Sequence, residues 1–164
     1  MKPRFILVTG VAGSGKTSVG KILAKRLGWD FYDADDFHPP ENIAKMTAGI
    51  PLDDSDRAPW LASLRELIVS SLQADRPAVL ACSALKERYR RQLAGEEEEI
   101  LTVYLKGDFE LIRSRLFSRT GHYMKPEMLQ SQFEALEEPM NALTVDVSPP
   151  VQVIVDGILS AMSQ

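Results

Sequence analysis

Short apolar runs alternate with longer segments in which apolar residues recur at helical spacing, from one end of the chain to the other. Most of the runs are nearly continuously apolar, as buried parallel strands are, and the candidate strands lie at residues 5–8, 30–37, 77–82, 100–105 and 142–147. Segments with the period of an amphipathic helix lie at residues 19–27, 41–46, 58–73, 86–93, 108–116, 128–136 and 151–162. This alternation predicts an α/β fold with one parallel sheet, covered by helices on both faces and joined by right-handed crossovers.

The whole chain has the size and composition of one soluble globular domain. Its 164 residues are 45% hydrophobic and 26% charged, so we expect a single domain over residues 1–164. The net charge of −4 argues against a broad nucleic-acid-binding surface. The first apolar run is too short for a signal peptide or a membrane span, and Cys82 is the only cysteine, which suits a reducing compartment. We therefore expect a cytoplasmic protein with no membrane or nucleic-acid partner.

A glycine-rich turn lies between the first predicted strand and the first predicted helix. Residues 10–17, GVAGSGKT, have the spacing G-x-x-x-x-G-K-T of a phosphate-binding loop. Glycines let successive backbone N–H groups face one anion, and the helix N-terminus behind them adds partial positive charge. Lys16 can reach the outer phosphates, and the Thr17 hydroxyl can ligate magnesium. The residues predicted to contact the nucleotide are Gly10, Val11, Ala12, Gly13, Ser14, Gly15, Lys16 and Thr17.

Two aspartates mark the end of the second predicted strand, where ligands of a parallel sheet gather. Asp33 and Asp35 alternate along this strand, so their side chains should share one side of it. Phosphoryl transfer needs magnesium and a group that orients the nucleophile, beside the phosphate cradle and positive charge. We assign Asp33 to magnesium and Asp35 to the attacking hydroxyl, although the residues leave open which aspartate meets the metal. Helix capping is the alternative, and it suffices for Asp36 and Asp54.

Basic residues follow the ends of the second and third predicted strands. Arg57, Lys86 and Arg90 could converge on a carboxylate or on hydroxyl groups of a substrate, or they could be solvated surface charges. Lys86 and Arg90 are four residues apart and share a helix face. His38 either touches the substrate or caps the turn that follows it.

Two further arginines precede a polar break at Gly121. Arg115 and Arg119 are four residues apart, and a mobile lid here could carry them over the phosphates and exclude water. They could also simply decorate the helix. Trp60 and Phe133 are better explained as core residues than as substrate contacts.

Four segments resemble the bacterial-type gluconokinase family. Residues 33–42, DADDFHPPEN, resemble that family's second signature. The other segments are GIPLDD with RAPWL in residues 49–61, ACSALK with YR in residues 81–90, and GHYM with QF, LE and P in residues 121–139. The similarity runs in order from Phe5 to about Pro139, so it is far more specific than the phosphate-binding loop alone.

The resemblance implies an enzyme that phosphorylates gluconate with ATP and Mg²⁺ to give 6-phosphogluconate. It also implies a three-layer P-loop kinase fold like that of shikimate kinase, with sheet order 2-3-1-4-5, a mobile lid at about residues 119–136 and often a homodimer. By position, residues 13–18, Ser18 included, would bind ATP, Thr17 would bind magnesium and Asp35 would meet the gluconate hydroxyl. The remaining roles are substrate binding by Arg57, Lys86, Arg90, His38 and His122, a lid arginine at Arg119, and a nucleotide contact by Arg115.

Other functions remain open from the residues alone. A kinase for shikimate or another polyol acid would share the phosphate-binding loop and the aspartates. A nucleotide-binding switch would need the loop and magnesium, but it would not require Asp35, Lys86, Arg90 and a lid arginine together.

Overall fold

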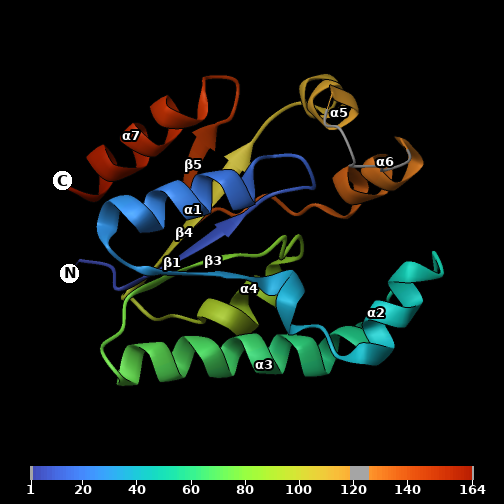
Figure 1. Ribbon diagram of the computed structural model, residues 1–164, viewed down its shortest axis with the longest axis horizontal. Helices are drawn as coiled ribbons and strands as arrows, with labels where there is room; N and C mark the ends of the chain where they lie inside the picture. The colour runs from blue at the N-terminus through green and yellow to red at the C-terminus, as the bar shows by residue number, and fades with distance from the viewer. Residues whose placement is uncertain (1, 119–125, 164) are drawn as a thin grey trace.

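The computed structural model describes residues 2–118 and 126–163. Strands and helices alternate along this part of the chain (Figure 1). In chain order they are β1 (Phe5–Thr9), α1 (Lys16–Leu27), β2 (Asp30–Asp33), the 3₁₀ helix η1 (Ala34–Phe37), α2 (Pro40–Thr47), α3 (Asp54–Gln73), β3 (Ala78–Ala81), α4 (Glu87–Ala94), β4 (Ile100–Lys106), α5 (Phe109–Ser118), α6 (Pro126–Ala135), β5 (Leu143–Asp146) and α7 (Val151–Met162).

The strands form one five-stranded sheet in the order β2-β3-β1-β4-β5. Every neighbouring pair is parallel, and β1 lies in the middle, with Phe5 opposite Ala78 of β3 and opposite Ile100 of β4. This order and the layered architecture confirm the fold predicted from the sequence. Of the predicted lid at about residues 119–136, residues 119–125 lie outside the described residues and most of the rest forms α6, and its mobility stays a prediction.

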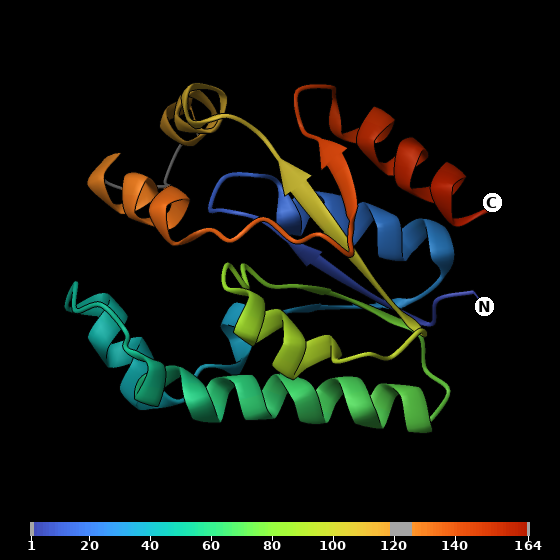
Figure 2. The same cartoon turned by 180° about the vertical axis from the view of Figure 1, so that it is seen from behind.

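Alternate residues of β1 build the two halves of the core. Phe5 and Leu7 pack with residues of α3 and α4 on one face, whereas Ile6 and Val8 pack with residues of α1 and α7 on the other. Figures 1 and 2 show these helix pairs on opposite sides of the sheet. All four side chains are fully buried. Burying each of them stabilises the fold by about 1.5–3 kcal/mol, which explains why the run is continuously apolar.

Local signals set the ends of several helices. Gly28 ends α1 in the left-handed conformation with φ of 72°, as its position in the sequence predicts. Asp53 and Asp56 form a capping box, so α3 begins at Asp54. The prediction that this helix begins near residue 58 was therefore wrong, and Arg57 belongs to its first turn. The Asp108 carboxylate caps α5 by accepting from the Leu111 N–H at 2.8 Å.

The second strand is shorter than the sequence predicted. It ends at Asp33, whose carboxylate accepts a hydrogen bond from the backbone N–H of Asp35 at 3.0 Å. This cap turns residues 34–37 into η1. The expectation that Asp33 and Asp35 alternate along one strand was therefore wrong, because the side chain of Asp33 itself ends the strand.

A third apolar cluster joins the glycine-rich loop to α5 and α6. Val11 packs there with Ile112, Leu116 and Leu129, and Phe133 lies against the same cluster. Trp60 of α3 is buried in the core, so both aromatic residues lie where the sequence predicted. Across residues 2–118 and 126–163, no helix combines the length and apolar character needed to cross a membrane.

Candidate active site

The glycine-rich loop after β1 is shaped for an anion. Gly10, Gly13 and Gly15 have φ values of 153°, 81° and 98°, which side chains rarely adopt. The backbone N–H groups of Gly13, Gly15 and Thr17 donate no hydrogen bond to any described residue. They lie at the N-terminus of α1, where the helix dipole favours negative charge. The loop therefore has the donors and the shape that a phosphate group requires.

Thr17 and Asp33 meet beside this loop. The Thr17 hydroxyl donates to the Asp33 carboxylate at 3.2 Å, which joins the first turn of α1 to the end of β2. A hydroxyl and a carboxylate are oxygen ligands that suit Mg²⁺, which usually keeps several of its waters. Among the described residues, no group of three or more His, Cys, Asp or Glu side chains could hold a metal. The pair therefore fits a magnesium ion that is shared with bound phosphates.

Asp35 lies at the centre of several charged side chains, although its own side chain is exposed. Loss of surrounding water and repulsion by Asp33 raise the pKa of Asp35, while His38 and Lys16 act in the opposite direction. These effects require that Asp33, His38 and Lys16 all lie near the Asp35 carboxylate. Lys16 also donates to the carbonyl of Val11 at 3.0 Å. Asp35 thus lies near Lys16, the residue predicted to reach the outer phosphates.

His38 follows η1 and stacks on Trp60. The ring centroids are 4.4 Å apart and the ring planes differ by 10°. Nδ1 of His38 lies 3.2 Å from the side-chain nitrogen of Asn42, which is 2% exposed. Burial lowers the pKa of His38, the Asp35 carboxylate opposes this shift, and Arg57 adds to it. His38 therefore lies near Asp35 and Arg57, two of the residues predicted to meet the substrate.

Arg57 and Lys86 carry positive charge on this side of the sheet. The Arg57 guanidinium lies over the Tyr89 ring, 5.8 Å from its centroid, and donates to the Tyr89 hydroxyl at 3.3 Å. It also contacts Asp54 at 3.4 Å. Lys86 directly precedes α4, and its ammonium makes no hydrogen bond or ion pair within the described part of the chain. Of the two, Lys86 has the more available charge.

Arg90 is buried, whereas its predicted role requires a guanidinium that can contact the substrate. It is 5% exposed and donates to the carbonyl of Ala84 at 2.8 Å, to the Glu87 carboxylate at 2.8 Å and to the carbonyl of Glu137. These bonds join α4 to the loop after β3 and to the chain that follows α6. The contact of Arg90 with the substrate stays a prediction. In this structure its hydrogen bonds link these segments to one another.

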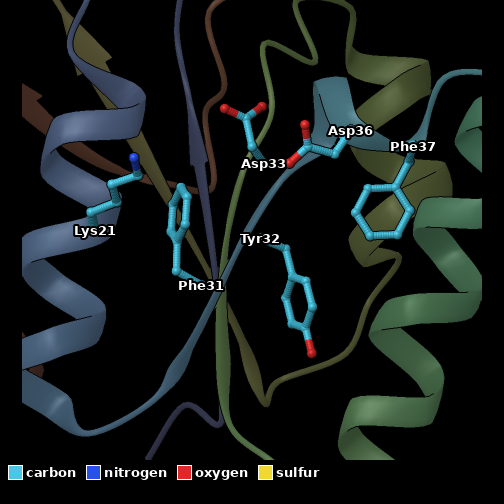
Figure 3. Close-up of a pocket in the computed structure, with 6 residues that line it drawn as sticks. All are labelled: Lys21, Phe31, Tyr32, Asp33, Asp36 and Phe37. Atoms are coloured by element: carbon cyan, nitrogen blue, oxygen red, sulfur yellow. The ribbon is translucent and has the colours of Figure 1, made fainter.

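A hollow of about 520 Å³ lies beside β2, at the free edge of the sheet. Figure 3 shows Asp33 and Asp36 at its upper end, with Lys21 and Phe31 toward α1 and with Tyr32 and Phe37 on the other side of the strand. Of these residues, only Asp33 belongs to the predicted site. The other residues of the predicted site, Lys16 and Asp35 among them, do not line this hollow.

Comparisons with known proteins place the chain in a family. The model of the shikimate kinase family matches residues 12–151. The probable gluconokinase of Mus musculus is 43% identical over 98% of this chain and 98% of its own length. The chain belongs to the shikimate kinase family and, within it, to the gluconokinases. The crystal structure of a gluconokinase from Sinorhizobium meliloti has a TM-score of 0.88 and 42% identity, over 98% of this chain and 92% of that one.

Shikimate kinases themselves are more distant from this gluconokinase family member. The shikimate kinase of Acinetobacter baumannii, solved in complex with shikimate, is 20% identical and has a TM-score of 0.59 over 97% of this chain and 92% of that one. This likeness shows the shared fold alone. The family resemblance stated from the sequence segments is therefore confirmed.

Residues around the predicted lid are only partly described. Arg115 donates to the carbonyl of Ser148 at 3.1 Å, so it lies beside the turn between β5 and α7. Its nucleotide contact stays a prediction. Arg119 and His122 lie outside the described residues, and so do their predicted roles at the phosphates and the substrate.

Two residues at the site were missed by reasoning from the sequence. Gln132 of α6 accepts a hydrogen bond from the Ala12 N–H at 2.7 Å and so contacts the phosphate-binding loop directly. Asn42 of α2 contacts His38. Both fall in the segments that resemble gluconokinases, and this was the only signal that marked them. An amide side chain in a helix has no pattern of its own that indicates its partner.

Proposed function

We propose that this protein is a gluconokinase, which transfers the γ-phosphoryl group of ATP to the primary hydroxyl of gluconate to form 6-phosphogluconate. The observation that carries the proposal is the similarity to proteins named gluconokinases, at 42–43% identity over nearly the whole chain. The arrangement of Lys16, Thr17, Asp33 and Asp35 at one end of the sheet agrees with it.

The donor side of the proposed site binds ATP through backbone groups and several side chains. The N–H groups of residues 13–18 take up the phosphates, and Lys16 offsets charge on the transferring group. Thr17 and Asp33 would hold Mg²⁺, directly or through water. When bound, the ion offsets the negative charge of the phosphates. Arg115 and the lid arginine Arg119 complete the nucleotide side of the proposal.

On the acceptor side, Asp35 orients the attacking hydroxyl and accepts its hydrogen bond. Lys16 lies near Asp35, so the hydroxyl and the phosphoryl group can meet between them in line. Arg57 and Lys86 supply positive charge for the carboxylate of the sugar acid. His38 and His122 contribute polar contacts, and Arg90 acts near the same loop. Most of the rate enhancement then comes from positioning and electrostatics.

A panel of acceptors tests the proposal. ADP release is measured with gluconate, other sugar acids, shikimate and nucleoside monophosphates, and the Asp35→Asn variant provides the background of ATP hydrolysis without transfer. We expect turnover above this background with gluconate alone or with gluconate best. Turnover with shikimate and none with gluconate would overturn the assignment in favour of the second candidate, which the match to the shikimate kinase model suggests.

A further inference from the structure

Stacking alone leaves one property of His38 undetermined. The ring lies flat against Trp60, and Trp60 is itself anchored because its Nε1–H donates to the carbonyl of Ala34 at 2.7 Å. These contacts fix the plane of the imidazole. They do not decide which of its two nitrogens carries the proton, since either neutral tautomer stacks equally well.

Asn42 decides it. The side-chain amide nitrogen of Asn42 donates to the backbone carbonyl of Asp56 at 2.9 Å. A carbonyl can only accept, so the amide oxygen cannot occupy this position, and the orientation of the amide follows. The same nitrogen lies 3.2 Å from Nδ1 of His38 and has a second hydrogen to donate. Nδ1 must then be the acceptor, and in the neutral ring the proton lies on Nε2.

The remaining nitrogen is available to the substrate. No oxygen of the described residues accepts a hydrogen bond from Nε2, and the charged groups that act on the pKa of His38 are Asp35 and Arg57. Both are assigned to the acceptor side of the site. Burial lowers the pKa of His38, which favours the neutral ring, the form in which the tautomer matters.

We propose that Asn42 is a positioning residue, which fixes neutral His38 with its proton on Nε2 and thereby aims an N–H donor at an oxygen of the sugar acid. The identity of the acid rests on the proposed function, whereas the tautomer does not. The ion pair of Lys45 with Asp56, at 2.8 Å, attaches the same helix α2 to the same residue of α3 without touching His38. It offers a matched control.

The tautomer is read directly by ¹⁵N NMR of the imidazole side chains of the full-length protein. The sequence has only two histidines, so the signal that disappears in the His122→Gln variant identifies the other as His38. We expect protonated Nε2 and unprotonated Nδ1 in the wild type and in Lys45→Met. In Asn42→Asp, the carboxylate should draw a proton to Nδ1. A wild-type ring protonated on Nδ1, or one unchanged by Asn42→Asp, would overturn the proposal.

A double-mutant cycle tests whether Asn42 acts through His38. We expect His38→Leu and Asn42→Ala each to raise the KM for gluconate about five- to tenfold, as for one lost hydrogen bond, with kcat and the KM for ATP within about twofold. The double variant should match His38→Leu alone, because the shared interaction is already lost. His38→Gln, which keeps an N–H donor near the position of Nε2, should recover most of the affinity.

Two outcomes of the double-mutant cycle would overturn the proposal. The two single effects on the KM for gluconate could multiply in the double variant, or Lys45→Met could raise this KM as much as Asn42→Ala does. Either result would mean that Asn42 only attaches α2 to α3. If another acid from the panel is the true acceptor, the cycle is run on the KM for that acid. If the gluconate assignment fails, the NMR measurement still tests the tautomer, and the cycle still tests the coupling between Asn42 and His38.

Discussion

The phosphate-binding loop is packed so closely against α5 that one methyl group at Gly13 should displace it. A Cβ atom at this position would lie 2.6 Å from Cγ of Leu116 and 2.9 Å from its Cδ2. Alanine at the φ of +81° also costs about 1–2 kcal/mol by itself, because the left-handed region crowds Cβ. Overpacking adds about 1–3 kcal/mol. We therefore expect Gly13→Ala to destabilise the fold by about 2–5 kcal/mol.

Two further variants separate the causes. Gly28→Ala has a similar φ of +72° with nothing within 4 Å of the added Cβ, so it should cost only the backbone term of about 1–2 kcal/mol. Leu116→Ala removes every Leu116 atom that the methyl group would meet. Adding it to Gly13→Ala should therefore cost about 1–3 kcal/mol less than the sum of the single effects.

Urea unfolding followed by tryptophan fluorescence gives the stabilities, and ADP-release kinetics give the KM for ATP. We expect Gly13→Ala to raise the KM for ATP at least about tenfold, because the shifted loop misdirects its N–H groups, and Gly28→Ala to leave this KM unchanged. Equal losses of stability for Gly13→Ala and Gly28→Ala, or strictly additive effects with Leu116→Ala, would refute the close contact between the loop and α5.

Three other predictions concern the chemistry of the site, and a fourth concerns the core. Thr17→Ala should raise the Mg²⁺ concentration needed for half-maximal activity about tenfold or more, whereas Thr17→Ser should restore it; an unchanged magnesium titration would exclude Thr17 as a ligand. Asp35→Asn should lower kcat about 100-fold or more with the KM for ATP within about twofold, and retained turnover would remove Asp35 from its role. Arg119→Ala should slow turnover far more than it weakens ATP binding, measured by equilibrium titration, and equal effects would argue against a lid arginine at the transition state. Burial raises the pKa of the Cys82 thiol to about 12, so the thiol stays neutral at pH 8 and should react with a thiol reagent only after unfolding; rapid reaction of the native protein would contradict this.

The sheet and its helices were predictable because their signals are local and repeated. The continuous apolarity of β1 and of β3 requires burial on both faces, and only helices on both sides can provide it. The proximity of Thr17 and Asp33 was predictable for a related reason. Thr17 follows β1 and Asp33 ends β2, so the topology brings them to one end of the sheet, where they lie 3.2 Å apart.

The predictions that failed or stayed incomplete depend on side-chain partners distant in the sequence. Strand β2 ends earlier than predicted because the carboxylate of Asp33 caps the next turn. The alternation of Asp33 and Asp35 in the sequence fits both a longer strand and this turn. Arg90 has the residue type of a substrate ligand, but its guanidinium donates hydrogen bonds to Ala84, Glu87 and Glu137. Periodicity reports which face of an element is buried, and it does not report what a buried charge contacts.

The hydrogen bonds of Arg90 belong to a set of contacts that connects the loops after β1 and β3. In-line transfer loses about 100-fold for a misplacement of about 1 Å, so the loops after β1 and β3 need fixed positions beyond the point where the strands end. The segment that begins with α6 contacts both of them. Gln132 accepts from Ala12 of the phosphate-binding loop, and Glu137 exchanges backbone and side-chain hydrogen bonds with Leu85 and Glu87 at 2.8 Å each. Arg90 donates to the carbonyl of Glu137, so it helps to fix the same segment that contacts both loops.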